Sequence, residues 1–366
     1  VSGEVDIEDL IPVEESVLTY TNIGYIKRQP IEIYNIQKRG GKGVSGMKQR
    51  DEDFVEDMFI ASSHDNILFV TNLGNMYKLK CYEIPEGSKQ SRGTNIVNLL
   101  QLVPGERIAA MMKTADFDAN KYFICVTKHG LAKRTSLEKY KNIRKSGLRA
   151  VGLNDGDEIA AAYLTEGDSS ALVATQNGYA ILFDESNMRP TGRVSRGVRA
   201  IKLRGDDLVV GVAKIYDENC TILTVTDKGM GRRALLSAYR SQRRGGYGIL
   251  NYKVGEEKGF VCGIKSIYAD DDVILISDNG IIIRIRANDL RTMGRYATGV
   301  RVMRLNDGAR VVTFTRTEHD DSAELAEVEA ASEEDIRQAE LAEQSEVIVD
   351  EKGEEDEAEE ETEDEE

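Results

Sequence analysis

The chain has 366 residues, which is long enough to bury a substantial core without disulfides or metal ions. No apolar stretch approaches about 18 residues and none has the layout of a signal peptide, so the sequence supports neither membrane insertion nor secretion. The formal net charge is −16, but positions 318–366 alone hold 25 acidic and two basic side chains, and positions 1–317 carry a net charge of +7.

This division of charge favours a polyanionic partner for the body, with the tail as an internal competitor for it. A solubilising tail on an ordinary protein would give the same composition. The cysteines contain no CxxC pair and lie in or near apolar runs, which is typical of reduced, buried thiols in a cytoplasmic protein. They are Cys81, Cys125, Cys220 and Cys262.

Three regions follow one another along the chain. Residues 1–16 are acidic and are expected to be a linker or lead-in segment. Residues 17–317 hold the β-branched, apolar runs from which a core can be built, without convincing amphipathic helix patterns. Residues 318–366 lack aromatic residues and are dominated by Glu and Ala, so they are expected to be a disordered acidic tail.

One motif recurs six times: an apolar run, a Thr or Ser, two residues and a Gly. The runs before it, such as 67–70, 123–126 and 273–276, are rich in β-branched and aromatic residues and predict buried strands. The Gly supplies the positive φ of a tight hairpin. The six glycines recur at a nearly regular interval and are Gly24, Gly74, Gly130, Gly178, Gly229 and Gly280.

Two further glycine patterns predict two more turns in each repeat. One comes later in every repeat than the first motif, at Gly40, Gly93, Gly147, Gly197, Gly245 and Gly299. The other precedes an acidic residue and an apolar pair, at Gly105, Gly156, Gly205 and Gly308, and more loosely at Gly255. Three turns in each repeat require four strands, so the sequence predicts an all-β, propeller-like ring of six four-stranded blades.

No sequence pattern predicts a catalytic, cofactor-binding or metal-binding site. His64, His129 and His319 lie far apart, and the HExxH, Walker A and Gly-x-Ser-x-Gly patterns are missing. Segment 41–46 matches GxGxxG but lacks a βαβ context, so dinucleotide binding is not supported. The Asn-Asp-Gly stretches near residues 155 and 307 lack the rest of a calcium loop. We expect a non-catalytic domain with no cofactor of its own.

Basic residues, in contrast, recur with the repeat. They follow the first glycine in five repeats, and the fourth is expected to compensate with Arg189, Arg193 and Arg196. Any single Lys or Arg is usually just a solvated charge, but equivalent positions in a ring form one band, which suits a curved phosphate backbone. The predicted DNA-binding rim consists of Lys27, Arg28, Lys78, Lys80, Arg92, Lys133, Arg134, Arg193, Arg196, Arg232, Arg233, Arg243, Arg244, Arg284 and Arg286.

The densest basic segment predicts a phosphate-binding loop, because glycines allow close approach of backbone amides and the cations add charge. Its residues are Gln37, Lys38, Arg39, Gly40, Gly41, Lys42 and Gly43. A related stretch at 242–248 has Tyr247 where Lys42 stands, so it is expected to bind phosphate less strongly.

Segment 37–43 closely resembles the GyrA box of the DNA gyrase A C-terminal domain, whose usual form has Arg where Lys38 stands. Asp-Leu-Ile-Pro at 9–12 and Gly-Tyr-Ile-Lys-Arg-Gln-Pro at 24–30 are similar to the start of that domain, and the resemblance covers 17–317. It implies a β-pinwheel, in which neighbouring blades exchange strands, and positive-handed wrapping of DNA that depends on the box.

The resemblance also implies that ATP, Mg²⁺ and the catalytic tyrosine belong to other parts of gyrase. The implied partners are double-stranded DNA, the gyrase A N-terminal cleavage domain and gyrase B, at the bacterial nucleoid. Two alternatives remain open: the corresponding domain of topoisomerase IV, and a propeller that is a scaffold for protein partners. We also expect the acidic tail to temper wrapping by lying against the rim.

Overall fold

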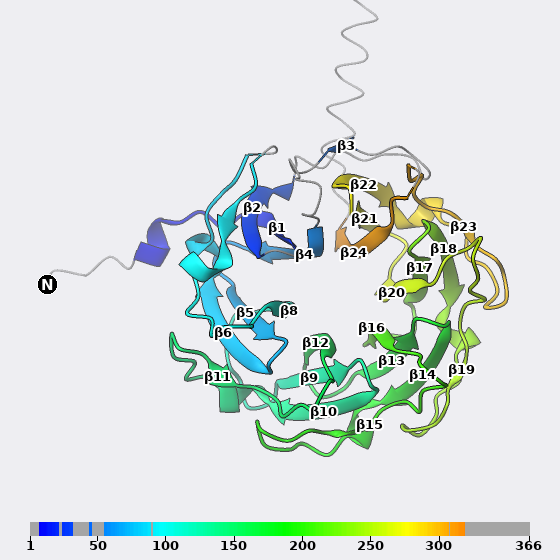
Figure 1. Cartoon of the computed structure of the whole chain (residues 1–366), viewed down its shortest axis with the longest axis horizontal. Coiled ribbons are helices and arrows are strands. Elements are labelled where there is room, and N and C mark those ends of the chain that lie inside the picture. Colours follow the sequence, from blue (N-terminus) through cyan, green and yellow to red (C-terminus); the bar gives the residue numbers. More distant parts are fainter. Residues whose placement is uncertain are drawn as a thin grey trace, which may run out of the picture. The chain divides into compact units, whose positions relative to one another are not determined.

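Six four-stranded antiparallel sheets are arranged like propeller blades around a central channel (Figure 1). The structure, a computed structural model, describes residues 7–21, 24–31, 44–45, 55–88, 91–306 and 308–318. These residues contain short 3-10 turns but no α-helix, which confirms the predicted all-β ring. The box at 37–43 and the predicted tail from residue 319 onward lie outside the described residues.

Each repeat contributes four strands that occupy equivalent places. The inner strands line the channel: β4 (Val55–Ser62), β8 (Ile108–Thr114), β12 (Ile159–Thr165), β16 (Val209–Ile215), β20 (Val261–Ile267) and β24 (Val311–Glu318). The second strands are β1 (Glu15–Thr21), β5 (Asn66–Thr71), β9 (Tyr122–Thr127), β13 (Ser170–Thr175), β17 (Thr221–Thr226) and β21 (Asp271–Ser277). The third strands are β2 (Tyr25–Pro30), β6 (Asn75–Lys80), β10 (Leu131–Ser136), β14 (Tyr179–Asp184), β18 (Met230–Leu235) and β22 (Ile281–Arg286).

The outer strands are two residues long: β3 (Val44–Ser45), β7 (Thr94–Asn95), β11 (Leu148–Arg149), β15 (Val198–Arg199), β19 (Ile249–Leu250) and β23 (Val300–Arg301). Each pairs with the third strand of the preceding repeat, as β15 does with β10. β3 pairs with β22, so a strand from the first repeat closes the ring on the last blade. This exchange is the β-pinwheel topology that the resemblance implies.

Seven 3-10 turns lie before or between these strands within the described residues: η1 (Ile7–Leu10), η3 (Cys81–Glu83), η4 (Ile96–Asn98), η5 (Leu137–Tyr140), η6 (Glu185–Asn187), η7 (Leu236–Ala238) and η8 (Ala287–Asp289). Five of them, η3 and η5 to η8, directly follow a third strand. The chain then runs along the outside of the ring to reach the preceding blade, where it forms an outer strand.

The recurring Thr or Ser and Gly form the hairpin between the second and third strands. The hydroxyl oxygen accepts a hydrogen bond from the first amide of the third strand, as in Thr175 with Tyr179 (3.1 Å). The same bond forms in all six repeats. Gly178 has a φ of +89°, and a Cβ there would lie 1.9 Å from the carbonyl oxygen of Tyr252, so this turn requires glycine.

The glycine before the outer strand lies later in the sequence than predicted in two repeats. Four outer strands do follow the predicted glycines directly, Gly93, Gly147, Gly197 and Gly299. In the fifth repeat the strand follows Gly248 rather than Gly245, and a Cβ at Gly248 would lie 2.3 Å from the carbonyl oxygen of Ala180 on the paired strand. In the first repeat the strand follows Gly43 rather than Gly40, so the end of the box leads directly into β3.

The core consists of apolar clusters between neighbouring blades. Because each sheet is covered on both faces, runs such as 67–70 are buried throughout, which explains their unbroken apolar sequence. Between the last and first blades, Ile274 and Ile276 of β21 pack with Val17 and Met58 of the first repeat. Burial of one such side chain contributes about 1.5–3 kcal/mol, so apolar packing closes the ring together with β3.

The sheets extend slightly beyond the expected range of 17–317, since β1 begins at Glu15 and β24 ends at Glu318. Part of the expected lead-in segment is attached to the ring. Glu8 forms an ion pair with Lys80 (2.8 Å), and Nε2 of His64 lies 2.7 Å from the carbonyl oxygen of Ile11.

All four cysteines are free thiols, and Cys81, Cys125 and Cys220 are buried, as predicted. Burial raises the pKa of the Cys81 thiol to about 11, so it stays protonated at neutral pH. No helix among the described residues is long and apolar enough to cross a membrane.

Candidate nucleic-acid interface

Six cations predicted to form the DNA-binding rim are buried. They lie on third strands, with 1% to 8% of their surface exposed: Lys27, Lys133, Arg134, Arg232, Arg233 and Arg284. Their charged groups contact protein atoms inside and between blades, which leaves no surface for a phosphate. The prediction of a rim role is wrong for these six residues.

Three of them, which we call the inter-blade cations, occupy the same place in alternate blades: Lys27, Lys133 and Arg232. Each donates hydrogen bonds to the chain just before the outer strand of the next repeat. Nζ of Lys133 donates to the carbonyl oxygens of Gly192 (3.2 Å) and Arg193. The corresponding acceptors are Ser88 and Ser91 for Lys27 (both 3.1 Å) and Arg295 for Arg232. Burial lowers the pKa of Lys133 to about 8, so it remains protonated at neutral pH.

The next residue along the third strand fixes the 3-10 turn of the following repeat in three blades. The Arg134 guanidinium lies 3.3 Å from the carboxylate of Glu185 in η6. Arg233 donates to the carbonyl oxygen of Ala287 in η8 (2.9 Å). Arg28 donates to the carbonyl oxygen of Ile84 (3.2 Å), after η3. Arg284 instead pairs with Asp272 of its own blade (2.7 Å).

Other predicted rim cations, on or near the first two blades and on the last, are less buried, and some of them contact protein groups. Lys78 is exposed, with Nζ 5.5 Å from the centre of the Phe117 ring. Lys80 pairs with Glu8, and the guanidinium of Arg92 lies 4.1 Å from the centre of the Tyr25 ring. Arg286 on the last blade is half-buried.

A second series of cations lies on the outside of the ring. We define the crossover segments as residues 139–154, 186–204, 236–254 and 290–306, which lead into and out of β11, β15, β19 and β23. Figure 1 shows these outer strands at the periphery, away from the channel. Each segment has four to six Lys or Arg residues and no Asp or Glu.

None of the crossover cations is buried, and most are exposed. In chain order they are Lys139, Lys141, Arg144, Lys145, Arg149, Arg189, Arg193, Arg196, Arg199, Lys202, Arg204, Arg240, Arg243, Arg244, Lys253, Arg291, Arg295, Arg301 and Arg304. Within the described part of the chain, none of them forms an ion pair with a carboxylate. They form a belt of positive charge that the described carboxylates leave unpaired.

From this belt the sequence prediction placed Arg193, Arg196, Arg243 and Arg244 on the rim and named Arg189 as a compensating cation. It aligned cations to the hairpin glycine, so it selected the buried third strands instead. A usable signal was present, because all four crossover segments lack acidic residues in a chain that holds 64 of them.

Several cations on the two faces of the ring pair with carboxylates. On one face, Glu158 lies 2.9 Å from Arg107 and 2.7 Å from Lys128. On the other face, Lys121 pairs with Asp116 (2.7 Å). The loops of that face, between inner and second strands, also expose Asp118, Glu166, Asp168, Glu218 and Asp270. A polyanion is therefore attracted to the belt and repelled by this acidic face.

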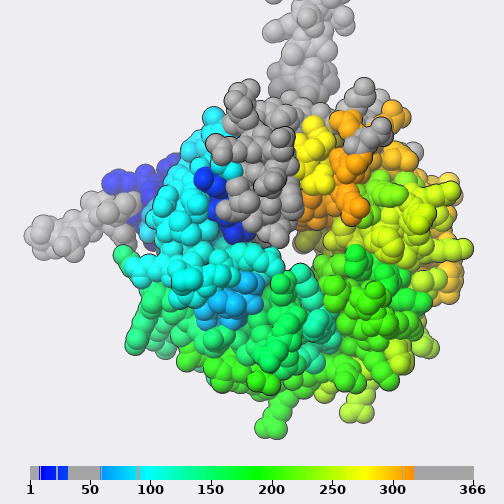
Figure 2. Space-filling view, viewed as in Figure 1, coloured from blue at the N-terminus to red at the C-terminus, as the bar shows by residue number. Residues whose placement is uncertain are grey.

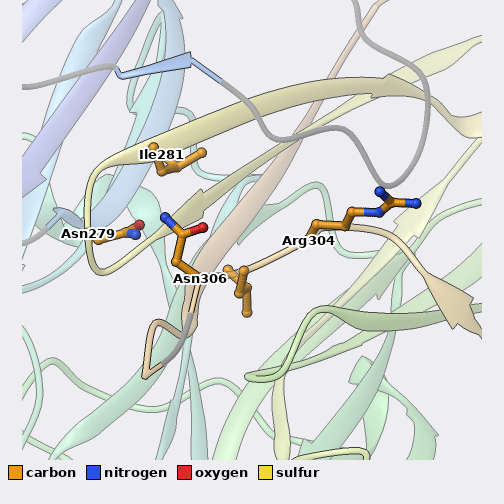
Figure 3. A pocket seen from close by; sticks show the side chains of 5 residues that line it. Asn279, Ile281, Arg304 and Asn306 are labelled. Atoms are coloured by element: carbon orange, nitrogen blue, oxygen red, sulfur yellow. The ribbon is translucent and has the colours of Figure 1, made fainter.

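Two hollows lie in the described part of the ring. The channel has a volume of about 960 Å³, is lined by the inner strands, and opens at the centre of the space-filling view (Figure 2). A smaller hollow of about 210 Å³ is lined by Asn279, Ile281, Arg304 and Asn306, which are neither nucleophiles nor bases (Figure 3). In the described ranges, no three His, Cys, Asp or Glu residues come close enough to hold a metal ion.

Known proteins are similar to this chain in sequence and in fold. The DNA gyrase A protein of Clostridium acetobutylicum is 44% identical over 331 residues, which are 90% of this chain and 40% of that protein. The DNA gyrase A protein of Staphylococcus epidermidis is 40% identical over 321 residues, which are 87% of this chain and 36% of that protein. The chain thus spans about 40% of the length of these curated relatives.

Solved structures agree with this similarity. A DNA gyrase A C-terminal domain superimposes with a TM-score of 0.76 at 27% identity and covers 83% of this chain and 99% of its own. A C-terminal domain of DNA topoisomerase IV superimposes with a TM-score of 0.65 at 27% identity and covers 88% and 99%. The family model of the DNA gyrase C-terminal domain, beta-propeller, matches residues 15–62, 65–115, 121–166, 170–215, 221–264 and 271–318. The chain belongs to this family of DNA gyrase C-terminal β-propeller domains.

Proposed function

We propose that the chain binds duplex DNA along the crossover segments and wraps it around the rim of the ring. The observation that carries this proposal is the belt of exposed cations without a described carboxylate partner, repeated on successive blades. Because the belt presents charge rather than a fixed set of donors for base edges, it favours binding that is independent of sequence.

The energy needed to bend DNA also favours a belt over a single loop. Bending a duplex to a radius of about 45 Å costs roughly 2–3 kcal/mol per helical turn by an elastic estimate. That cost has to be offset by several phosphate contacts in each turn. Four crossover segments with four to six cations each can make such contacts on four successive blades.

The box is proposed to act in the same belt. Residues Gln37 to Gly43 directly precede β3, which has the place in the last blade that β15 has in the third. In this proposal Lys38, Arg39 and Lys42 bind phosphates of the same duplex. The prediction that the acidic tail competes for this belt concerns residues outside the described part of the chain.

We further propose that the wrap is positive-handed and that the chain is the wrapping part of a DNA gyrase A protein. In this proposal the gyrase A N-terminal cleavage domain and gyrase B supply strand passage and ATP hydrolysis with Mg²⁺, so that wrapping leads to negative supercoiling in the bacterial cytoplasm. The names of the curated relatives support gyrase over topoisomerase IV. The ring itself has no proposed catalytic role.

A titration with salt tests DNA binding against the protein-scaffold alternative. If the belt neutralises about six phosphates, the logarithm of the association constant should fall with the logarithm of salt concentration with a slope of about −5. The measurement is fluorescence anisotropy with a labelled duplex at several salt concentrations. Weak binding with a flat salt dependence would favour a scaffold for protein partners.

A further inference from the structure

Two tyrosines in the crossover segments are exposed within the belt of cations. Tyr296, shortly before β23, is 76% exposed, and Tyr247, shortly before β19, is 44% exposed. Val194, which precedes β15, is 69% exposed. Three successive repeats therefore present an apolar side chain in the loop that leads to the outer strand.

Arg295 holds the Tyr296 ring in place. The guanidinium lies 4.5 Å from the ring centre, and Nη2 donates a hydrogen bond to the Tyr296 hydroxyl (2.9 Å). Arg295 is itself fixed, because it donates to the carbonyl oxygens of Ala238 (3.1 Å) and Leu250. The exposed Tyr296 ring is thus packed against a guanidinium group whose position is fixed by hydrogen bonds.

Tyr247 is supported in a similar way by the preceding crossover segment. The ammonium of Lys202 and the guanidinium of Arg204 lie 4.7 and 4.8 Å from the centre of its ring. Arg204 also stacks on Tyr179 (3.8 Å) and donates to the carbonyl oxygen of Tyr247 (2.8 Å). These contacts keep the Tyr247 ring at one place on the rim.

The Tyr296 ring itself contributes little to the stability of the fold. A ring that is three-quarters exposed, as in Tyr296, buries little apolar surface and so contributes little through the hydrophobic effect. A ring that is already ordered loses little side-chain entropy when it binds a partner. Contact with an apolar ring does not stabilise a phosphate, but it suits the minor groove, whose walls are the apolar faces of deoxyribose. Proteins that bend DNA insert apolar side chains there, often beside arginines.

We propose that Tyr296 and Tyr247 enter the minor groove of the wrapped duplex and position it on the rim, while the surrounding cations bind the phosphates. This inference rests on the proposed wrapping function. It assigns the two tyrosine side chains to the places where the minor groove faces the protein. There they act as residues that position the bent duplex. A ring that only shields its guanidinium from solvent would have no such effect.

The absence of tryptophan from the whole sequence allows a direct test. Tyr296→Trp introduces a single tryptophan at the proposed contact. Tyr216→Trp is the matched control, since Tyr216 is 48% exposed but lies after β16, where it lines the channel rather than the rim. Emission and acrylamide quenching are measured for both variants in the full chain, with and without a saturating duplex of mixed sequence. Wrapping is measured in parallel by energy transfer between the duplex ends.

We expect DNA to change the emission of Tyr296→Trp and to protect it from acrylamide, and to leave Tyr216→Trp unaltered. Tyr296→Ala should lower the fraction of bent DNA by roughly threefold or more while changing DNA affinity less. The reason is that the tyrosine side chain stabilises the bent duplex and does not neutralise phosphate charge. Tyr296→Phe should restore bending. If Tyr296→Trp binds and bends DNA with unaltered emission and quenching, the inference is overturned and wrapping stands. If neither the wild-type chain nor any variant binds DNA, the proposed function is wrong as well.

Discussion

Replacing Lys133 with methionine is expected to release the crossover segment of the fourth repeat from the third blade. Nζ of Lys133 donates to the carbonyl oxygens of Ala150 (2.6 Å), Gly192 and Arg193, and methionine fills a similar volume without a donor. Hydrogen bonds to a charged group contribute about 1.5–3 kcal/mol, so amide exchange of residues 191–199 should accelerate by roughly tenfold to a hundredfold. Hydrogen exchange read by mass spectrometry measures this directly.

The global free energy of unfolding should change less than the local exchange rate. Removal of a buried ammonium group also removes its desolvation penalty, which offsets part of the lost hydrogen bonding. Lys139→Met is the matched control, because Lys139 is exposed at the start of a crossover segment. It should leave exchange unaltered. Equal exchange of residues 191–199 in wild type and Lys133→Met would contradict the role assigned to the inter-blade cations.

Neutralising three cations of one crossover segment is expected to weaken DNA binding in a salt-dependent way. Arg196, Arg199 and Lys202 are exposed around β15, and replacing all three with glutamine keeps their polarity but removes their charge. If each contacts one phosphate, the salt slope should become shallower by about 2–3. Affinity at low salt should fall by tenfold or more, since each lost contact costs roughly a kcal/mol.

The matched control for this variant removes the same charge elsewhere on the ring. Lys113, Lys128 and Lys228 lie outside the crossover segments, on an inner strand and in turns. Their replacement by glutamine should change the slope by less than about 1. If both triple variants weaken binding equally, net charge rather than the belt determines affinity.

The blades of this fold could be predicted from local chemistry. The apolar runs and the Thr-x-x-Gly hairpins depend on contacts within one repeat, and the hydroxyl of Thr175 and its equivalents make the same bond six times. Such local requirements leave a regular trace in the sequence. Strand exchange leaves no comparable trace, because β15 pairs with β10 of the preceding repeat. Only the resemblance to a known family implied it.

The candidate site was harder to predict for the same reason. A lysine such as Lys133 is expected at the surface, since charged side chains are rarely fully buried unless they have partners. Its partners include carbonyl groups of the next repeat, which the exchanged strand brings to it. Arg193, in contrast, lies on that exchanged segment and stays on the rim. The burial of the inter-blade cations therefore depends on a long-range pairing that no local pattern encodes.

Ligation of a relaxed, nicked plasmid with the chain bound measures the central claim most directly. DNA that follows the belt around the ring with positive handedness must leave a positive change in linking number once the nick is sealed. The account predicts that this change grows with the ratio of protein to DNA and is largely lost in the variant with Arg196, Arg199 and Lys202 replaced. An unaltered linking number at saturating protein would contradict it.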